Sequence, residues 1–162
     1  MVIEWPNLRS NFSTPLTETG AADALTGKIT RARIFDPAES NEPTRILETD
    51  DPCEVEVTWQ LSGSAVYVVG GTWHAELYLD QIDGSRQVKI GPVNVPVNIT
   101  GDPTPFDASF HVPPGTVEEG VYKLVALITH SGTGESNELT GMGGDVEIGT
   151  VQFLSPEVES NL

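Results

Sequence analysis

The sequence predicts an all-β protein, a two-sheet antiparallel β-sandwich of about seven strands. Several short segments alternate apolar and polar residues with a period of two, as strands with one buried and one solvated face do. Turn residues separate these segments, and the chain of 162 residues contains 16 glycines and 12 prolines. No segment keeps a 3.6-residue apolar period over a length that would let a helix cover a sheet. The length is that of one domain.

Seven segments carry the strand pattern. They cover residues 28–35, 53–61, 72–79, 87–97, 106–112, 121–129 and 146–154. In the second segment every other residue from Cys53 to Leu61 is apolar, and Trp59 belongs to this row. Trp73 belongs to the apolar row of the third segment. Both tryptophans are therefore expected in the core.

Two of these segments lose their alternation at a glycine. The shift falls at Gly91-Pro92 in 87–97 and at Gly149-Thr150 in the last segment. An extra residue in a strand shifts the alternation in this way, so both steps predict bulges. Proline within 87–97 favours an edge strand there.

The sandwich is expected to span residues 27–155, with an irregular N-terminal arm at 1–26 and a C-terminal tail at 156–162. Pro6, Pro15 and Gly20 interrupt any period in the arm. Residues 21–25 favour a short helix. Trp5 and Phe12 are the large apolar residues of the arm, and they can be buried only if the arm docks. Docking on this domain and docking on a neighbouring molecule both remain open.

Three features resemble a known class of domain. A strand containing Trp59 precedes a strand that opens with Trp73, and Glu119-Gly120-Val121-Tyr122 leads into the sixth strand. This order resembles the immunoglobulin-like and fibronectin-type-III-like sandwiches over residues 27–155. The resemblance implies that Tyr122 forms a tyrosine corner, with its hydroxyl bonded to upstream backbone. Cys53 is the only cysteine, so the disulfide of antibody domains is missing. This fold hosts many functions and implies no activity.

The charge of the chain limits its partners. Eight basic and 24 acidic residues give a net charge of −16. Nucleic acids and anionic membranes attract basic surfaces, so neither is an expected partner. Cations, basic proteins, neutral ligands such as sugars and further copies of the chain remain. The N-terminal residues lack the basic and apolar regions of a signal peptide, which predicts a cytoplasmic protein, with export by a leaderless route left open.

The strand order sorts the loops into two ends. Loops 36–52, 80–86 and 113–120 share an acidic end, where Asp50, Asp51, Asp80 and Asp83 are candidate calcium ligands. Calcium prefers several converging carboxylate oxygens. Alternatively, the acidic residues at this end form a solvated rim that binds no ion. Apart from calcium, no metal or cofactor is expected.

Loops 62–71, 98–105 and 130–144 share the other end, which is rich in glycine. Candidate interface residues there are Val66, Tyr67, Val68, Val69 and Met142. Exposed, they would form an apolar patch of the kind that marks an interface. Alternatively, they cover the open end of the sandwich or extend a strand.

No pattern predicts catalytic residues. His74 and His111 point outward from strands expected in different sheets, and His130 stands apart. We therefore expect a non-catalytic module that binds a protein partner or copies of itself through its arm, strand edges or loop ends. Strand 87–97 would accept an added strand, with the arm as donor. The alternative function is calcium or carbohydrate binding. A sugar site is expected to have outward aromatic residues on one sheet face, and Tyr78 is the one clear candidate.

Overall fold

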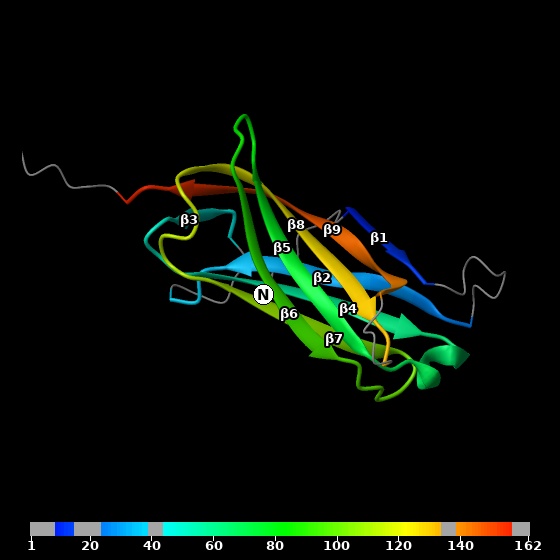
Figure 1. The fold of residues 1–162 in the computed structure, drawn as a ribbon. Coiled ribbons are helices and arrows are strands. Elements are labelled where there is room, and N and C mark those ends of the chain that lie inside the picture. Colours follow the sequence, from blue (N-terminus) through cyan, green and yellow to red (C-terminus); the bar gives the residue numbers. More distant parts are fainter. Residues whose placement is uncertain (1–8, 15–23, 39–43, 134–138, 157–162) are drawn as a thin grey trace, which may run out of the picture.

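Two β-sheets pack face to face in the computed structural model, which describes residues 9–14, 24–38, 44–133 and 139–156 (Figure 1). The described strands are β1 (Arg9–Ser13), β2 (Thr26–Phe35), β3 (Ile46–Glu48), β4 (Cys53–Ser62), β5 (Thr72–Gln81), β6 (Gln87–Pro96), β7 (Thr104–Val112), β8 (Gly120–Ser131) and β9 (Leu139–Leu154). A short 3-10 helix, η2 (Ser64–Val68), follows β4. The predicted two-sheet sandwich is confirmed. No helix in these ranges is long and apolar enough to cross a membrane.

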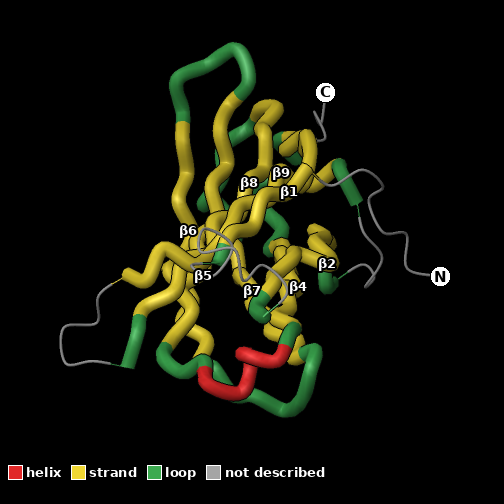
Figure 2. Tube along the Cα trace, turned by 90° about the vertical axis from the view of Figure 1, so that its right-hand side faces the viewer, coloured by secondary structure: helices red, strands yellow, loops and turns green. Residues whose placement is uncertain are grey.

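The two sheets differ in size. The larger has the order β1-β9-β8-β5-β6, and β3 joins it as a parallel partner of β9. The smaller has the order β2-β4-β7. All other pairings are antiparallel. The β5–β6 hairpin extends beyond the rest of the sandwich in both views (Figures 1 and 2).

The core lies between the sheets and is built from the predicted apolar rows. Along β4 buried and half-buried residues alternate without exception. Trp59 and Trp73 are fully buried, with their rings edge to face and 5.7 Å apart. Phe106 contacts both, at 6.1 Å from Trp59 and 5.4 Å from Trp73. Such aromatic pairs add about 1 kcal/mol each beyond the area they bury.

The predicted edge strand and both bulges are present. β6 is the last strand of the larger sheet, and its register with β5 shifts between Ala75 and Leu77, opposite Gly91-Pro92. In β9 the register with β8 shifts so that Ile148 is the extra residue. This bulge lies next to Gly149, where the alternation changes.

The strand count and the arm require correction. The described residues form nine strands rather than about seven, because β1 and β3 were not predicted. Part of the arm is a strand rather than irregular chain, since β1 pairs with β9 of the same chain. Both added strands are five residues or shorter, so their alternation is too brief to recognise. Most of the remaining arm, including Trp5 and Pro15–Asp23, and the tail from 157 onward lie outside the described residues.

The last strand begins earlier than expected. β9 starts at Leu139, whereas the alternation predicts a start at 146. Gly141, Gly143 and Gly144 occupy the missed part. Glycine has no side chain to alternate, so this part of the strand resembles a loop in the sequence.

The tyrosine corner is confirmed, and at each end of the sandwich a hydrogen bond joins two of the three loops that the sequence sorts there. The Tyr122 hydroxyl donates to the Glu118 carbonyl oxygen at 2.8 Å. At the acidic end, Gly115 N–H donates to the Thr49 carbonyl at 2.8 Å, which joins two of the three loops. At the glycine-rich end, Gly63 N–H donates to Asp102 Oδ1 at 2.8 Å.

Candidate functional site

The four candidate calcium ligands do not form one group. Among the described residues, Asp50 and Asp51 lie with Glu48, and their ligating oxygens are within 4.8 Å of one another. Asp80 instead accepts a hydrogen bond from Gln87 at 2.6 Å, and neither it nor Asp83 belongs to this group. Partial burial, followed by the nearby negative charges of Asp36 and Asp50, raises the pKa of Asp51. Calcium binding by these carboxylates stays a prediction.

The candidate interface residues divide into buried and exposed members. Val66 and Met142 are buried and belong to the core, so they do not contribute to an exposed patch. Val66 closes the end of the sandwich from η2, as one alternative interpretation expected. Tyr67 and Val68 are 65% and 85% exposed. Val69 is half-buried against the core.

Phe12 docks on its own domain through strand β1. Its ring is half-buried and lies 6.1 Å from the ring of Trp73. A Cβ atom on Gly27 or Gly144 would collide with this ring, so the two glycines form a socket for it. The described part of the arm therefore packs in cis, and Trp5 lies outside the described residues.

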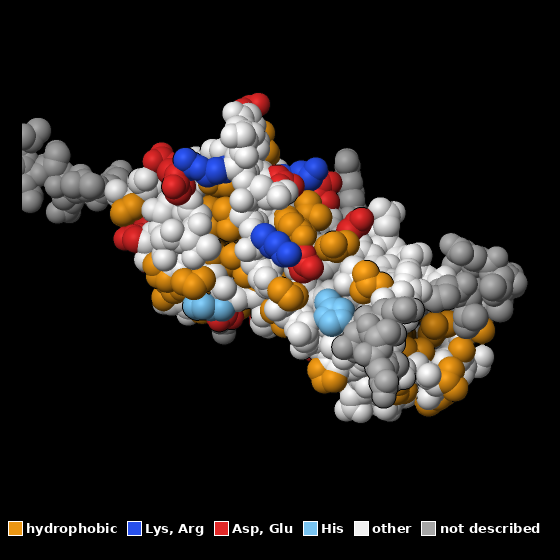
Figure 3. All heavy atoms as spheres, in the orientation of Figure 1, with side chains coloured by type: hydrophobic (Ala, Val, Ile, Leu, Met, Phe, Trp, Pro, Cys, Tyr) orange, Lys and Arg blue, Asp and Glu red, His pale blue; other side chains and the backbone are white. Residues whose placement is uncertain are grey.

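The outward side chains of the larger sheet form rows that cross its strands; we call this surface the outer face. One row contains Asn94, His74, Thr129, Gly143 and Ser13, which are register partners across β6, β5, β8, β9 and β1. The next row contains Glu76, Leu127, Asp145 and Asn11. In Figure 3 acidic, basic and hydrophobic side chains are mixed over β5 and β6.

Hydrogen bonds hold His74 in one orientation on this face. Its Nδ1 lies 2.7 Å from Asn94 Oδ1 and its Nε2 lies 2.8 Å from Ser131 Oγ. Since Oδ1 only accepts, the proton belongs on Nδ1, and Nε2 accepts from the serine hydroxyl. A serine, a histidine and an orienting amide in this order resemble the connectivity of a hydrolytic triad. Ser131 is only 2% exposed, however, so its hydroxyl is not accessible to a substrate.

A second polar group occupies β5 and β6. Tyr78 donates a hydrogen bond to Glu76 Oε2, and Lys89 Nζ lies 3.2 Å from the same oxygen. The Tyr78 hydrogen bond and the Lys89 charge together lower the pKa of Glu76. The same hydrogen bond raises the pKa of Tyr78. Both groups therefore stay in their ordinary states at neutral pH.

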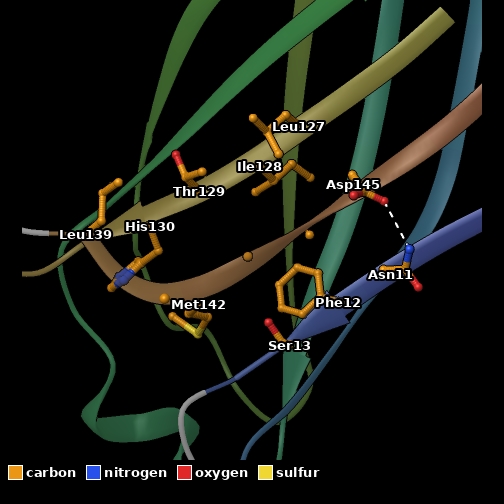
Figure 4. A pocket seen from close by; sticks show the side chains of 13 residues that line it. Asn11, Phe12, Ser13, Leu127, Ile128, Thr129, His130, Leu139, Met142 and Asp145 are labelled. Carbon is orange, nitrogen blue, oxygen red and sulfur yellow. Dashed lines mark hydrogen bonds between the residues drawn. The ribbon is translucent and has the colours of Figure 1, made fainter.

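A hollow of about 540 Å³ lies over β1, β9 and β8, within the usual size range of ligand sites (Figure 4). Its exposed or half-buried polar side chains are Asn11, Ser13, Thr129 and Asp145, and buried His130 also lines it. Among its apolar side chains, Leu127 is half-buried and Leu139 is exposed. Asn11 Nδ2 donates to Asp145 Oδ1 at 3.4 Å at one end, and Leu139 lies at the other (Figure 4).

Glycine makes this hollow. Gly143 stands between Thr129 and Ser13 in the first row and places no side chain on the outer face. Its φ is 151°, and a Cβ there would collide with the Ile128 carbonyl, so only glycine fits. The hollow was not predicted, because residues 130–144 were interpreted as a loop. The sequence did contain one sign of the hollow, the closely spaced glycines Gly141, Gly143 and Gly144, two of which pair with the polar strand β1.

Comparison with known proteins adds information on the fold. No protein-family model matches the sequence, and no curated protein matches it. The C-terminal domain of Wzt is similar in structure, with a TM-score of 0.54 at 12% sequence identity. The alignment covers 95% of this chain and 82% of that one. The chain therefore has the immunoglobulin-like β-sandwich fold that the sequence resembles.

Two further solved structures match more weakly. One is the CARDB domain of a Pyrococcus furiosus protein in complex with di-metal ions, with 16% identity and a TM-score of 0.37, covering 79% of this chain and 89% of that one. The other is Pseudomonas fluorescens alkylpurine DNA glycosylase AlkC bound to DNA containing an abasic site analog. It has 11% identity and a TM-score of 0.37, covering 86% of this chain and 33% of that one. At these scores neither carries an argument about this protein.

Proposed function

We propose that the chain is a non-catalytic carbohydrate-binding module whose ligand occupies the hollow on the outer face. The observation that carries this proposal is the lining of the hollow. Amide, hydroxyl and carboxylate groups surround a patch of bare backbone, and apolar side chains flank them. A sugar presents hydroxyl groups at its rim and C–H groups on its ring faces, so it matches both kinds of surface.

The polar groups of the hollow include both hydrogen-bond acceptors and hydrogen-bond donors for the hydroxyl groups of a sugar. Asp145 only accepts, and its two oxygens suit two neighbouring hydroxyls. Asn11 and Ser13 each donate and accept, and Thr129 Oγ1, which donates its proton to the His74 carbonyl, accepts. Leu127 and Leu139 offer apolar surface, and Leu139 is 67% exposed.

The charge of the site supports an uncharged ligand. Among the described residues that line the hollow, Asp145 is the only one with a charged side chain. The whole chain carries −16, so it repels anions. A neutral saccharide avoids this repulsion, whereas uronic acids and sialylated or phosphorylated glycans do not.

An array of neutral and anionic oligosaccharides tests the proposal, followed by calorimetric titration of the glycans that bind. Neutral glycans are expected to bind. Asp145→Asn replaces one acceptor oxygen by a donor, so it should weaken binding by about tenfold.

Gln60→Ala is the matched control. Gln60 is half-buried on β4, in the smaller sheet, so affinity should stay at the wild-type value. The proposal is wrong if no glycan binds, or if Asp145→Asn binds as tightly as the wild type.

Protein binding at the glycine-rich end is the second candidate function. The exposure of Tyr67 and Val68 on η2 supports it, because two adjacent large apolar side chains face solvent there. Aromatic residues are enriched in protein interfaces. Such an interface would not involve the outer face, so both functions are compatible.

A further inference from the structure

The outer face offers more than the hollow, because the row through Gly143 continues to the opposite edge of the sheet. Asn94, His74, Thr129, Gly143 and Ser13 are register partners on five adjacent strands. Four inter-strand spacings of about 4.8 Å each make this row about 19 Å long. The hollow occupies only its β8–β9–β1 part.

Hydrogen bonds within the protein already orient the side chains in the part of the row outside the hollow. His74 is held by Asn94 at 2.7 Å and by Ser131 at 2.8 Å. Thr129 Oγ1 donates to the His74 carbonyl at 3.5 Å. Side chains held in this way lose little further freedom when a ligand binds, which favours affinity.

On the central strand β8 the hydrogen-bonding groups end at the row. On β8 the outward residues beyond Thr129 are Leu127 and Val125, which are apolar. Farther along, Lys123 lies 3.7 Å from Glu147, and this ion pair occupies the face. Over β8 a polar chain therefore finds a hydrogen-bonding partner at Thr129, in the row, and not at the outward residues beyond it.

The row is also free of unbalanced charge. Asn94, Thr129, Gly143 and Ser13 have no ionisable side chain. Glu76, the neighbour of His74 on the same face of β5, is balanced by Lys89. The charged group that faces a ligand is Asp145, at the hollow end.

We propose that the outer face binds a neutral oligosaccharide of several units, which runs across the strands from the hollow beside Asp145 to His74 and Asn94. This inference rests on the proposed carbohydrate binding and names its ligand class. One end of the bound segment contacts Asp145, Asn11 and Ser13. At the other end the ligand accepts from Asn94 Nδ2 and lies against the imidazole of His74, whose two nitrogens are already hydrogen-bonded to Asn94 and Ser131.

A length series tests this inference. The probes are monosaccharide to hexasaccharide members of the neutral glycan series that the array identifies, titrated by calorimetry. Affinity should rise with length until the ligand spans the row and then stay constant. His74→Ala should weaken the longest ligand by about tenfold and leave the shortest unchanged, whereas Asp145→Asn should weaken both.

Two further variants make the result decisive. Asn94→Ala removes the last group of the row from an exposed position on the edge strand, so it should reproduce the length-dependent loss without affecting the core. His111→Ala is the matched histidine control, because His111 is exposed on β7 of the other sheet. It should bind every length as the wild type does.

The outcomes separate the two proposals. If saccharides bind with an affinity that does not depend on length, the extended site is wrong and the hollow alone accounts for binding. The same conclusion follows if His74→Ala and Asn94→Ala leave the longest ligand unaffected. If no saccharide binds at all, the proposed function itself fails.

Discussion

At the scale of single residues, His130 shows how a buried polar side chain joins two loops. Its Nε2 donates to the Gly70 carbonyl at 2.6 Å, and its Nδ1 lies 2.7 Å from Thr140 Oγ1. The ring also packs edge to face against Trp73 at 5.0 Å. These contacts fit a neutral imidazole that donates at Nε2 and accepts at Nδ1.

Acid should destabilise the fold through this residue. Burial, with a smaller contribution from His74, lowers the pKa of His130 below 6.5, although the hydrogen bond to Gly70 opposes this. The unfolded chain therefore takes up the proton first as the pH falls. The stability that neutral His130 contributes is complete above about pH 6.5 and is lost as the pH falls toward its folded-state pKa.

Urea unfolding at about pH 7.5 and about pH 5.5 checks this prediction, because most carboxylates titrate below that window. The free energy of unfolding of the wild type should fall more between these values than that of His130→Gln, which has no titrating group at this position. Equal losses in the two proteins would show that His130 does not cause the acid sensitivity.

At the scale of elements, β1 is the strand most dependent on one anchor. It has five residues, and among the described strands it pairs only with β9. Its half-buried residue is Phe12, whose ring occupies the socket between Gly27 and Gly144. Because β1 also supplies Asn11 and Ser13 to the hollow, its docking builds the proposed site.

Phe12→Ala should cost about 2 kcal/mol, less than a fully buried phenylalanine, and should loosen β1. Trypsin cleavage after Arg9 reports on the strand, and urea unfolding reports on stability. Cleavage after Arg9 should become several times faster, while cleavage after Lys123 in the central strand β8 stays slow. Unchanged cleavage and stability would mean that the socket does not hold β1 in place.

At the scale of the whole molecule, the net charge of −16 governs any contact between copies. Like charges oppose association at low ionic strength, and salt screens them. The adjacent apolar residues Tyr67 and Val68 form one exposed surface that would gain from association.

If the second candidate function includes self-association, the mass measured by light scattering should rise above 17.4 kDa with protein concentration, and more so in high salt. Val68→Asp places a charge at the most exposed apolar position, so it should keep the chain at the monomer mass. A wild type that stays at 17.4 kDa under every condition rules out self-association through η2.

The sequence predicted the core rows correctly because alternation is a local property. Trp59, Trp73 and Tyr122 lie where the period of two and the tyrosine-corner resemblance place them. The short strands were missed, since three residues from Ile46 to Glu48 carry no recognisable period. For Val66 the sequence left an exposed patch and cover for the end of the sandwich both open, because composition does not show which side chains of a short segment face the core.

The candidate site was far less predictable. His74 and Thr129 were recognisable as outward residues, but nothing local shows that they are neighbours. Their adjacency depends on the pairing of β5 with β8, and that of Thr129 with Ser13 depends on β9 and β1. One shift of register would move every second side chain to the other face.

The sequence by itself determined which side chains of each long strand face inward, since neighbouring residues on a strand point to opposite sides. It also determined the acidic character that disfavours anionic partners. Only the tertiary structure decided which strands lie side by side, that β1 docks on its own sheet, and that glycines open a hollow among polar residues from three strands. Backbone hydrogen bonds between segments far apart in the chain set those neighbours, and no local pattern encodes them.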